Sequence, residues 1–167
     1  SVTSIGDKAF FLCNSLKSIK VPDSVMNFGD GCFDDDTVIY AKSNSKVIDY
    51  AKQNELQYVI DDTAPVTTVS TVESANQSAI VKITSNEELQ QVSGWTLSSD
   101  RLTLTKTYTE NTVENIIVKD LVGNTSTVNV KVTNIDKTAP TVKVSYSTTE
   151  LTNKNVVVTI KANEQLQ

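Results

Sequence analysis

The sequence contains no histidine among its 167 residues. A Ser-His-Asp or Cys-His nucleophile system is therefore excluded, and the side chain best suited to acid–base catalysis near neutral pH is missing. Two cysteines are also too few for an all-thiolate zinc site, which takes about four. We expect no enzyme activity, no cofactor, and no catalytic, cofactor-binding or metal-binding residue in this chain.

Basic clusters and long apolar runs are missing as well. The formal net charge is −5, which disfavours nucleic acid because phosphate binding needs a basic footprint. No stretch approaches the roughly 18 apolar residues of a membrane span, so we expect no membrane insertion. No signal peptide is recognisable at the start, and we expect the chain to be a piece of a longer protein.

The composition changes partway along the chain. Residues 2–60 hold both cysteines, three of the five glycines and most of the aromatic side chains. From Thr63 onward Thr and Val alternate, which is typical of β-strands. We therefore predict two unlike folds that are joined near Asp61 and Asp62.

The first part of the chain contains an internal repeat. Ser1–Phe10 superposes on Ser24–Phe33, with Gly6 opposite Gly29 and Phe10 opposite Phe33. An apolar period of roughly 23 residues predicts a solenoid, in which each coil buries its apolar face against the next coil.

The segment VTSIGDKAFFLCNSLKSIKVPDSV resembles the BspA-like class of bacterial leucine-rich repeats, whose pattern is SV-x-x-IG-x-x-AF-x-x-C-x-x-L-x-x-I-x-(I/V)P. The agreeing positions are Ile5, Gly6, Ala9, Phe10, Cys13, Leu16, Ile19 and Pro22. The resemblance implies an extracellular or cell wall-associated bacterial protein that attaches to protein ligands. In the next coil Asp36 takes the place of Cys13 and Lys42 that of Ile19, so we expect the repeat to end there.

The segment that follows resembles the closing part of such arrays. Ser43, Asn44 and Ser45 offer an N-cap, and a helix with one apolar stripe is expected to cover the end of the solenoid before Gln57–Ile60 returns as a strand. The stripe consists of Val47, Ile48, Tyr50 and Ala51.

Cys13 and Cys32 are compatible with a disulfide or with two buried thiols. They occupy different repeat positions, which favours buried thiols, and the family resemblance implies that position 13 faces the interior. Neither has a histidine or a basic cluster to activate it, so we expect no catalytic role.

A second, longer repeat fills the rest of the chain. Thr63–Pro65 recurs as Thr138–Pro140, and Ile83–Gln90 recurs as Ile160–Gln167, so the repeated unit begins near Asp61 and again at Asp136. The second copy stops at the counterpart of Gln90. Its two strands, Thr141–Ser147 and Val156–Lys161, cannot close a sandwich, so we expect this tail to be poorly ordered or paired with an exposed edge.

Apolar residues in the first of these units alternate with a period of two, which predicts an all-β sandwich. We expect turns at Ser98–Asp100 and at Asp120–Asn124, where Gly123 and Asn124 suit positive φ, and Trp95 in or beside the core. The expected strands include Val66–Val69, Ile80–Thr84, Leu102–Tyr108, Ile116–Val118 and Val128–Val132.

The segments DDTAP, GWTLSSDRLTLTKTYTEN, VKDLVGNTSTV and VTNIDKTAP resemble bacterial Ig-like modules of surface and secreted proteins. The predicted fold is therefore mainly β: the C-terminal end of a leucine-rich-repeat solenoid with one capping helix, then an Ig-like sandwich, then a truncated second one. The corresponding domains are 1–60, 61–136 and 137–167.

Two acidic groups are candidate calcium sites. Asp34–Asp36 is better interpreted as a solvated loop, and the second group is better interpreted as turn caps at the module junctions. The second group comprises Asp61, Asp62, Asp120, Asn134 and Asp136. The spacing of Glu114, Lys119 and Asp120 requires no acid–base pair.

Two functions fit these features. The chain is part of an adhesin-like protein, with a solenoid for a host-matrix or bacterial-surface protein ligand, carried on strands Leu16–Lys20 and Val38–Tyr40, and Ig-like modules as a stalk. Alternatively, it is a non-catalytic spacer of a larger secreted enzyme. The sequence does not identify the ligand.

Overall fold

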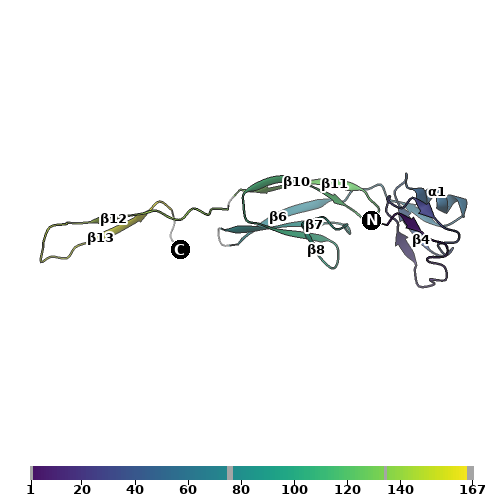
Figure 1. The fold of residues 1–167 in the computed structure, drawn as a ribbon, viewed down its shortest axis with the longest axis horizontal. Helices are drawn as coiled ribbons and strands as arrows, with labels where there is room; N and C mark the ends of the chain where they lie inside the picture. Colours follow the sequence, from purple (N-terminus) through teal and green to yellow (C-terminus); the bar gives the residue numbers. More distant parts are fainter. Residues whose placement is uncertain (1, 75–76, 134, 165–167) are drawn as a thin grey trace. The chain divides into compact units, whose positions relative to one another are not determined.

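The computed structural model describes residues 2–74, 77–133 and 135–164. The chain forms two compact units, Ser1–Ile135 (unit 1) and Asp136–Gln167 (unit 2) (Figure 1). Unit 1 contains two separate hydrophobic cores, one under parallel strands and one between antiparallel sheets. The separation of domains 1–60 and 61–136 stays a prediction.

The first core belongs to a parallel solenoid. β1 (Ser4–Ile5) pairs with β3 (Asn27–Phe28), and β2 (Ser18–Lys20), β4 (Val38–Ala41) and β5 (Tyr58–Ile60) form a parallel sheet in that order. Phe10 and Phe33 occupy the same repeat position and stack with ring centroids 5.6 Å apart. The expected stacking of coils is confirmed.

The second coil is shorter than the first. Ser4 pairs with Asn27, one full period along the chain, whereas Ser18 pairs with Val38, which comes before that period is complete. Ile39 therefore lies opposite Ile19 and is fully buried. The assignment of Lys42 to the position of Ile19 was wrong, and so was that of Asp36 to the position of Cys13, because the loop before β4 is shortened.

The two cysteines differ in their environment. Both are free, Cys32 is fully buried, and Cys13 is exposed. The prediction of two buried thiols was therefore wrong for Cys13. Among the described residues, only the second coil packs against the first coil, and it does so on one side. Cys13 of the first coil is therefore left open to solvent.

The helix α1 (Lys46–Gln53) lies between β4 and β5 and buries the expected stripe, with Val47, Ile48 and Ala51 inaccessible to solvent. Ser45 stands at the N-cap position but makes no side-chain cap, because its hydroxyl donates instead to the Lys42 carbonyl at 2.8 Å. Tyr50 packs beside Phe28 and Phe33, which ties the helix to the second coil.

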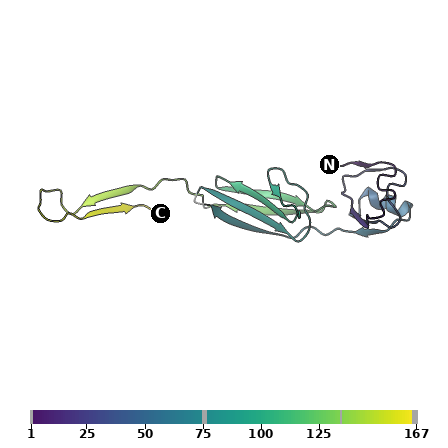
Figure 2. The ribbon, with the colours of Figure 1, turned by 90° about the horizontal axis from the view of Figure 1, so that it is seen from below.

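The second core lies between two antiparallel sheets. One sheet has the order β6 (Thr67–Ser74), β7 (Ser78–Ser85), β9 (Thr103–Tyr108), β8 (Thr96–Leu97), and the other is the hairpin of β10 (Thr112–Lys119) and β11 (Thr125–Val132). In Figure 1 β10 and β11 lie above β7 and β8, and in the view of Figure 2 the two layers overlap. Trp95 is 5% exposed in this core, as predicted.

The predicted turns are present. Gly123 has φ 109°, whereas Asn124 is not left-handed and contributes its side chain instead. In the other turn the Ser98 hydroxyl and the Leu102 amide both donate to the Asp100 carboxylate.

Unit 2 consists of one antiparallel hairpin in its described part. β12 (Val142–Tyr146) pairs with β13 (Val158–Ala162). The two expected strands are thus formed, and their expected poor order stays a prediction. The residues matching Glu88–Gln90 of the first copy lie outside the described part.

Candidate functional site

One face of the parallel sheet points away from the solenoid core. Ile39 and Ala41 are fully buried, so their neighbours Val38 and Tyr40 face outward, because side chains alternate along a strand. The register places Lys20 and Val59 on either side of Tyr40. We call this row, Lys20, Tyr40 and Val59, the outer strand face.

The outer strand face carries apolar side chains at the surface. Val59 is 42% exposed, Tyr40 is half-buried, and Ser18 and Val38 form a second row beside them. Tyr40 beside Val59 combines an apolar surface with a polar tip, which suits a protein ligand, whereas the Lys20 ammonium at the edge of the row is held by Glu88.

A second group of polar residues connects the solenoid to the sandwich. The Asp23 amide donates to the Val122 carbonyl at 3.1 Å, and the Asn124 side-chain amide donates to the Asp61 carbonyl at 2.9 Å. Lys20 pairs with Glu88 at 2.9 Å. We call these three contacts the junction.

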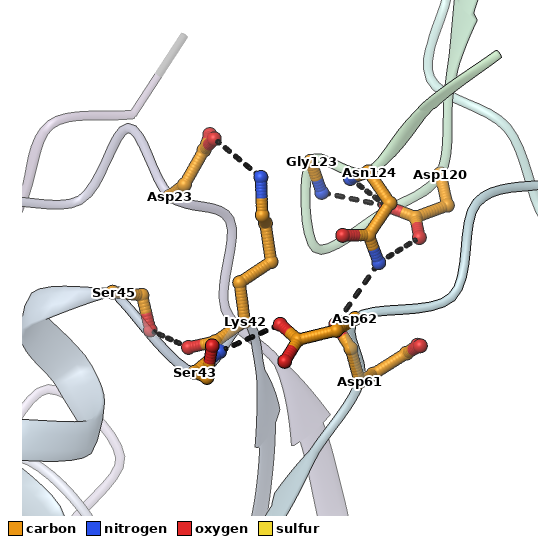
Figure 3. Close-up of polar contacts among 9 residues, drawn as sticks. All are labelled: Asp23, Lys42, Ser43, Ser45, Asp61, Asp62, Asp120, Gly123 and Asn124. Atoms are coloured by element: carbon orange, nitrogen blue, oxygen red, sulfur yellow. Dashed lines mark hydrogen bonds and ion pairs between the residues drawn. The ribbon is translucent and has the colours of Figure 1, made fainter.

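Asp120 organises the turn at the junction. Its Oδ1 accepts from the amides of Gly123 and Asn124 at 2.6 and 2.8 Å, and its Oδ2 accepts from the Asn124 side chain at 2.8 Å. Figure 3 shows Asn124 between the Asp120 carboxylate and the Asp61 backbone. The turn formed after β10 thus positions the group that holds the solenoid.

Three carboxylates meet beside this turn. Oxygens of Asp61, Glu87 and Asp120 lie within 4.8 Å of one another. Such oxygens fit calcium by chemistry, but calcium takes about six to eight oxygen ligands, and Asp120 already accepts three hydrogen bonds. The turn itself explains the position of Asp120, and we assign no metal ligand.

The acidic group that the sequence predicted at the module boundaries is only partly brought together. Asp61 and Asp120 do meet, whereas Asp62 accepts from the Ser43 amide at 2.9 Å and Asp136 from the Thr138 amide at 2.8 Å. Hydrogen bonding to these backbone amides lowers the pKa of both carboxyls. Asn134 lies outside the described residues.

Glu87 was missed by the sequence analysis. It follows β7 in a loop and belongs to no motif, although the repeat places Glu164 at the same position of the second copy. Burial raises the pKa of Glu87, the negative charges of Asp120 and Asp61 raise it further, and Lys20 opposes them.

Replacing Glu87 by glutamine is expected to stabilise unit 1 at neutral pH by up to about 1 kcal/mol. Folding raises the pKa of Glu87, so the folded state holds the proton more tightly than the unfolded state does. The stability that comes from protonated Glu87 is therefore fully present below the unfolded pKa and is lost as the pH rises through the folded pKa. The gain should shrink toward about pH 4, near the pKa of an unperturbed Glu. Urea unfolding followed by Trp95 fluorescence at several pH values measures it.

Glu88→Gln is the matched control. It removes the same charge from the next residue but breaks the ion pair with Lys20, so it should change stability little or lower it slightly. A loss of stability in Glu87→Gln at neutral pH, with a chelator present, would contradict the assignment of Glu87 as a repelled carboxylate.

The acidic run Asp34–Asp36 lines a cavity of about 260 Å³ next to Cys13. Asp34 Oδ1 accepts from the Leu12 amide at 2.9 Å, and its Oδ2 has no hydrogen-bond partner among the described residues. Asp35 and Asp36 are exposed. Asp34 links this loop to the first coil, and the interpretation of the run as a solvated loop stays a prediction.

Glu114 belongs to a network on the sandwich. Lys106 pairs with it at 2.9 Å and lies 4.6 Å from the centroid of the Tyr108 ring, while the Tyr108 hydroxyl donates to Glu114. The hydrogen bond from Tyr108 and then that from Lys106 lower the pKa of Glu114. Burial, followed by the Glu114 hydrogen bond, raises the pKa of Tyr108. This network holds β9 to β10, and Lys119 is not part of it.

The geometry of residues 2–60 is that of a leucine-rich-repeat solenoid, with short parallel strands and one coil stacked on the next. The family model for the BspA type leucine rich repeat region (6 copies) matches residues 1–120, and the chain belongs to that family. This family is typical of bacterial surface proteins, and leucine-rich repeats generally mediate protein binding.

The family match extends beyond the parallel strands. It includes β6 to β10, which are antiparallel. The comparison with curated proteins finds no match, and neither does the comparison with solved structures. The comparisons give no support for Ig-like modules, so that resemblance stays a hypothesis. Within the described residues, no helix has the length and apolar character of a membrane span.

Proposed function

We propose that this chain is part of an adhesin-like protein of the bacterial surface or of the secreted fraction, in which the solenoid binds a protein ligand through the outer strand face. The observation that carries the proposal is the outward row of Lys20, Tyr40 and Val59 on the parallel sheet. The family supports it, because leucine-rich repeats generally mediate protein binding.

In this proposal the antiparallel sandwich is an Ig-like stalk module without enzyme activity. Its core side chains come from both sheets, and the junction holds it to the solenoid through contacts from Lys20, Asp23 and Asp61. The complete lack of histidine supports a non-catalytic role. A stalk of this kind holds the solenoid in place and does not itself contact the ligand.

The second candidate is a non-catalytic spacer of a larger secreted enzyme. The cavity beside Asp34–Asp36 favours it, since polar groups line most of this cavity and offer a ligand little apolar surface. The two functions differ in one measurable property, which is whether the outer strand face binds a protein.

Binding of the 167-residue chain to a panel of purified host extracellular-matrix proteins and to bacterial surface preparations tests the proposal, with calcium and with a chelator. The double variant Tyr40→Ala/Val59→Ser should weaken the binding at least about tenfold, because it removes the apolar centre of the face. Surface plasmon resonance gives the affinities.

The matched control is Val113→Ser/Ile117→Ser. These side chains are 63% and 60% exposed on β10 of the sandwich, so their loss removes a similar apolar surface away from the solenoid. Binding should be unchanged. If the control loses affinity and the solenoid variant keeps it, the sandwich is the binding part. If the intact chain binds none of the probes, the spacer function is favoured.

A further inference from the structure

The strand β10 has a paired side and an unpaired side. It pairs with β11 in one continuous register, and the Asp120 amide, directly after β10, donates to the Asn124 carbonyl in the turn to β11 at 3.1 Å. The backbone N–H and C=O groups of alternate residues point to the same side of a strand. The even-numbered residues of β10 therefore direct these groups toward β11, whereas Val113, Asn115 and Ile117 direct theirs away from it. We call these three residues the β10 edge.

The β10 edge is open to solvent. Val113 and Ile117 are 63% and 60% exposed, and Asn115 is exposed as well. The Gln90 amide donates to the Lys119 carbonyl on this side at 2.8 Å, but a cavity of about 300 Å³ then lies between residues 90–93 and Ile117. No described residue bonds to the backbone N–H or C=O groups of the β10 edge. The edge therefore offers unpaired donors and acceptors to another strand.

The β10 edge also lacks the features that protect sheet edges. Natural proteins protect such edges with lysine, proline, bulges or inward-pointing charges. The β10 edge contains only valine, asparagine and isoleucine, and its register with β11 has no bulge. The one inward charge of the strand centre, Glu114, is paired with Lys106 at 2.9 Å. A long, exposed and partly apolar edge of this kind is a site where a further strand adds.

We propose that β10 is the docking edge for a second copy of this chain, whose own β10 pairs with it antiparallel about a two-fold axis through Asn115. The pairing joins two β10–β11 hairpins into one four-stranded sheet that continues from one molecule to the other. Such a contact is self-complementary, as a two-fold axis requires. The proposal does not depend on the outer strand face binding a ligand.

The side chains of the β10 edge match in this arrangement. The order apolar, amide, apolar is the same in both directions, so Val113 lies opposite Ile117 of the second copy on each side of the axis. Asn115 lies opposite its own counterpart. Because Asn129 already donates to Asn115 Oδ1 at 2.9 Å, the Asn115 side-chain NH₂ can donate across the axis, and the amides form a row over four strands.

The backbone selects the same arrangement. With the axis through Asn115, every N–H and C=O group of the β10 edge meets a group of the second copy. An axis through Ile116 would instead place Val113 opposite Lys119, whose carbonyl already accepts from Gln90.

Charge excludes the neighbouring register on the other side. An axis through Glu114 would place this carboxylate directly opposite its own counterpart, which is destabilising. With the axis through Asn115, Glu114 lies opposite Ile116 and no charged residue faces another.

The size of the contact makes the dimer weak. Pairing of residues 112–118 covers about 24 Å along the strand and about 10 Å across it, which is well below the roughly 800 Å² on each partner of a standard interface. We therefore expect a dissociation constant between about 10 μM and 1 mM. Below about 1 μM the chain is then a monomer, and ligand affinities measured there do not depend on this contact.

The test is amide hydrogen exchange of the 167-residue chain at about 10 μM and at about 1 mM. The amides of Val113, Asn115 and Ile117 should exchange at least about twofold more slowly at the higher concentration, because they become bonded in the dimer. The amides of Ile116 and Val118 already face β11 and serve as the reference, which should change little. Sedimentation equilibrium over the same range gives the dissociation constant.

Two lysine substitutions make the test specific for the edge. Ile117→Lys places a charge opposite Val113 of the second copy and should weaken the dimer at least about tenfold. Thr127→Lys is the matched control, because Thr127 lies beside Ile117 on β11, away from the edge. It adds the same charge to the same face and should change the dissociation constant less than about threefold. Trp95 fluorescence checks that both variants are folded.

Three results would overturn the proposal. The amides of the β10 edge could exchange at the same rate at both concentrations. The two lysine variants could weaken the dimer equally. Finally, slower exchange at high concentration could be confined to residues 142–146 and 158–162, which would assign self-association to unit 2 instead of β10.

Discussion

Gly29→Ala is expected to destabilise the solenoid by about 3 kcal/mol. A Cβ at position 29 would lie 2.2 Å from the Asp7 carboxylate and 2.3 Å from the Asp7 backbone nitrogen. The carboxylate cannot move away freely, because its Oδ1 accepts from the Asp30 amide at 3.0 Å. The clash with the backbone nitrogen remains in any rotamer of Asp7, so the two coils must separate.

Gly6→Ala is the matched control, since Gly6 occupies the same position of the repeat. A Cβ there meets nothing within 4 Å, and the expected change is within about 0.5 kcal/mol. Exchange of the Phe10 amide, which donates to the Cys32 carbonyl between the coils at 2.9 Å, reports the solenoid in both variants. Equal protection of Phe10 in the two variants would contradict the close approach of the coils at Gly29.

Asp120→Ala is expected to destabilise the sandwich by about 3 kcal/mol. Asp120 is 1% exposed, and its removal leaves the amides of Gly123 and Asn124 without their acceptor. The freed Asn124 side chain also loses the bond that aims it at Asp61. Urea unfolding followed by Trp95 fluorescence should show a lower midpoint with an unchanged slope.

Asp100→Ala provides the comparison for this turn. Asp100 accepts from Ser98 and Leu102 in a similar local arrangement, but it is on the surface, where water replaces the lost acceptor. The effect should be clearly smaller than that of Asp120→Ala. If the two substitutions lower the free energy of unfolding equally, the burial of Asp120 does not explain its contribution to stability.

Local patterns predicted the strands and turns well. The alternation of Thr and Val identified the β10–β11 hairpin, and Gly123 marked the turn, because both depend on the periodicity and backbone freedom of neighbouring residues. The stripe of Val47, Ile48 and Ala51 predicted the face of α1 for the same reason.

Features that depend on distant residues were not predictable in this way. Because the second coil is shorter, Ile39 rather than Lys42 lies opposite Ile19. A repeat of fixed length does not reveal where a loop is shortened. Glu87 reaches Asp61 and Asp120 only through the pairing of β7 with its neighbours. The exposure of Cys13 depends on whether its coil is covered on one side or on both sides. The sequence pattern of the coil is the same in the two cases.

The junction has a mechanical consequence. If a single peptide link joined the solenoid to the sandwich, the sandwich could rotate freely about that link when pulled. Contacts from Lys20, Asp23 and Asp61 instead attach the two parts at separate places. A pull on the sandwich therefore loads these contacts together with the peptide link, and they must break before the sandwich can turn against the solenoid.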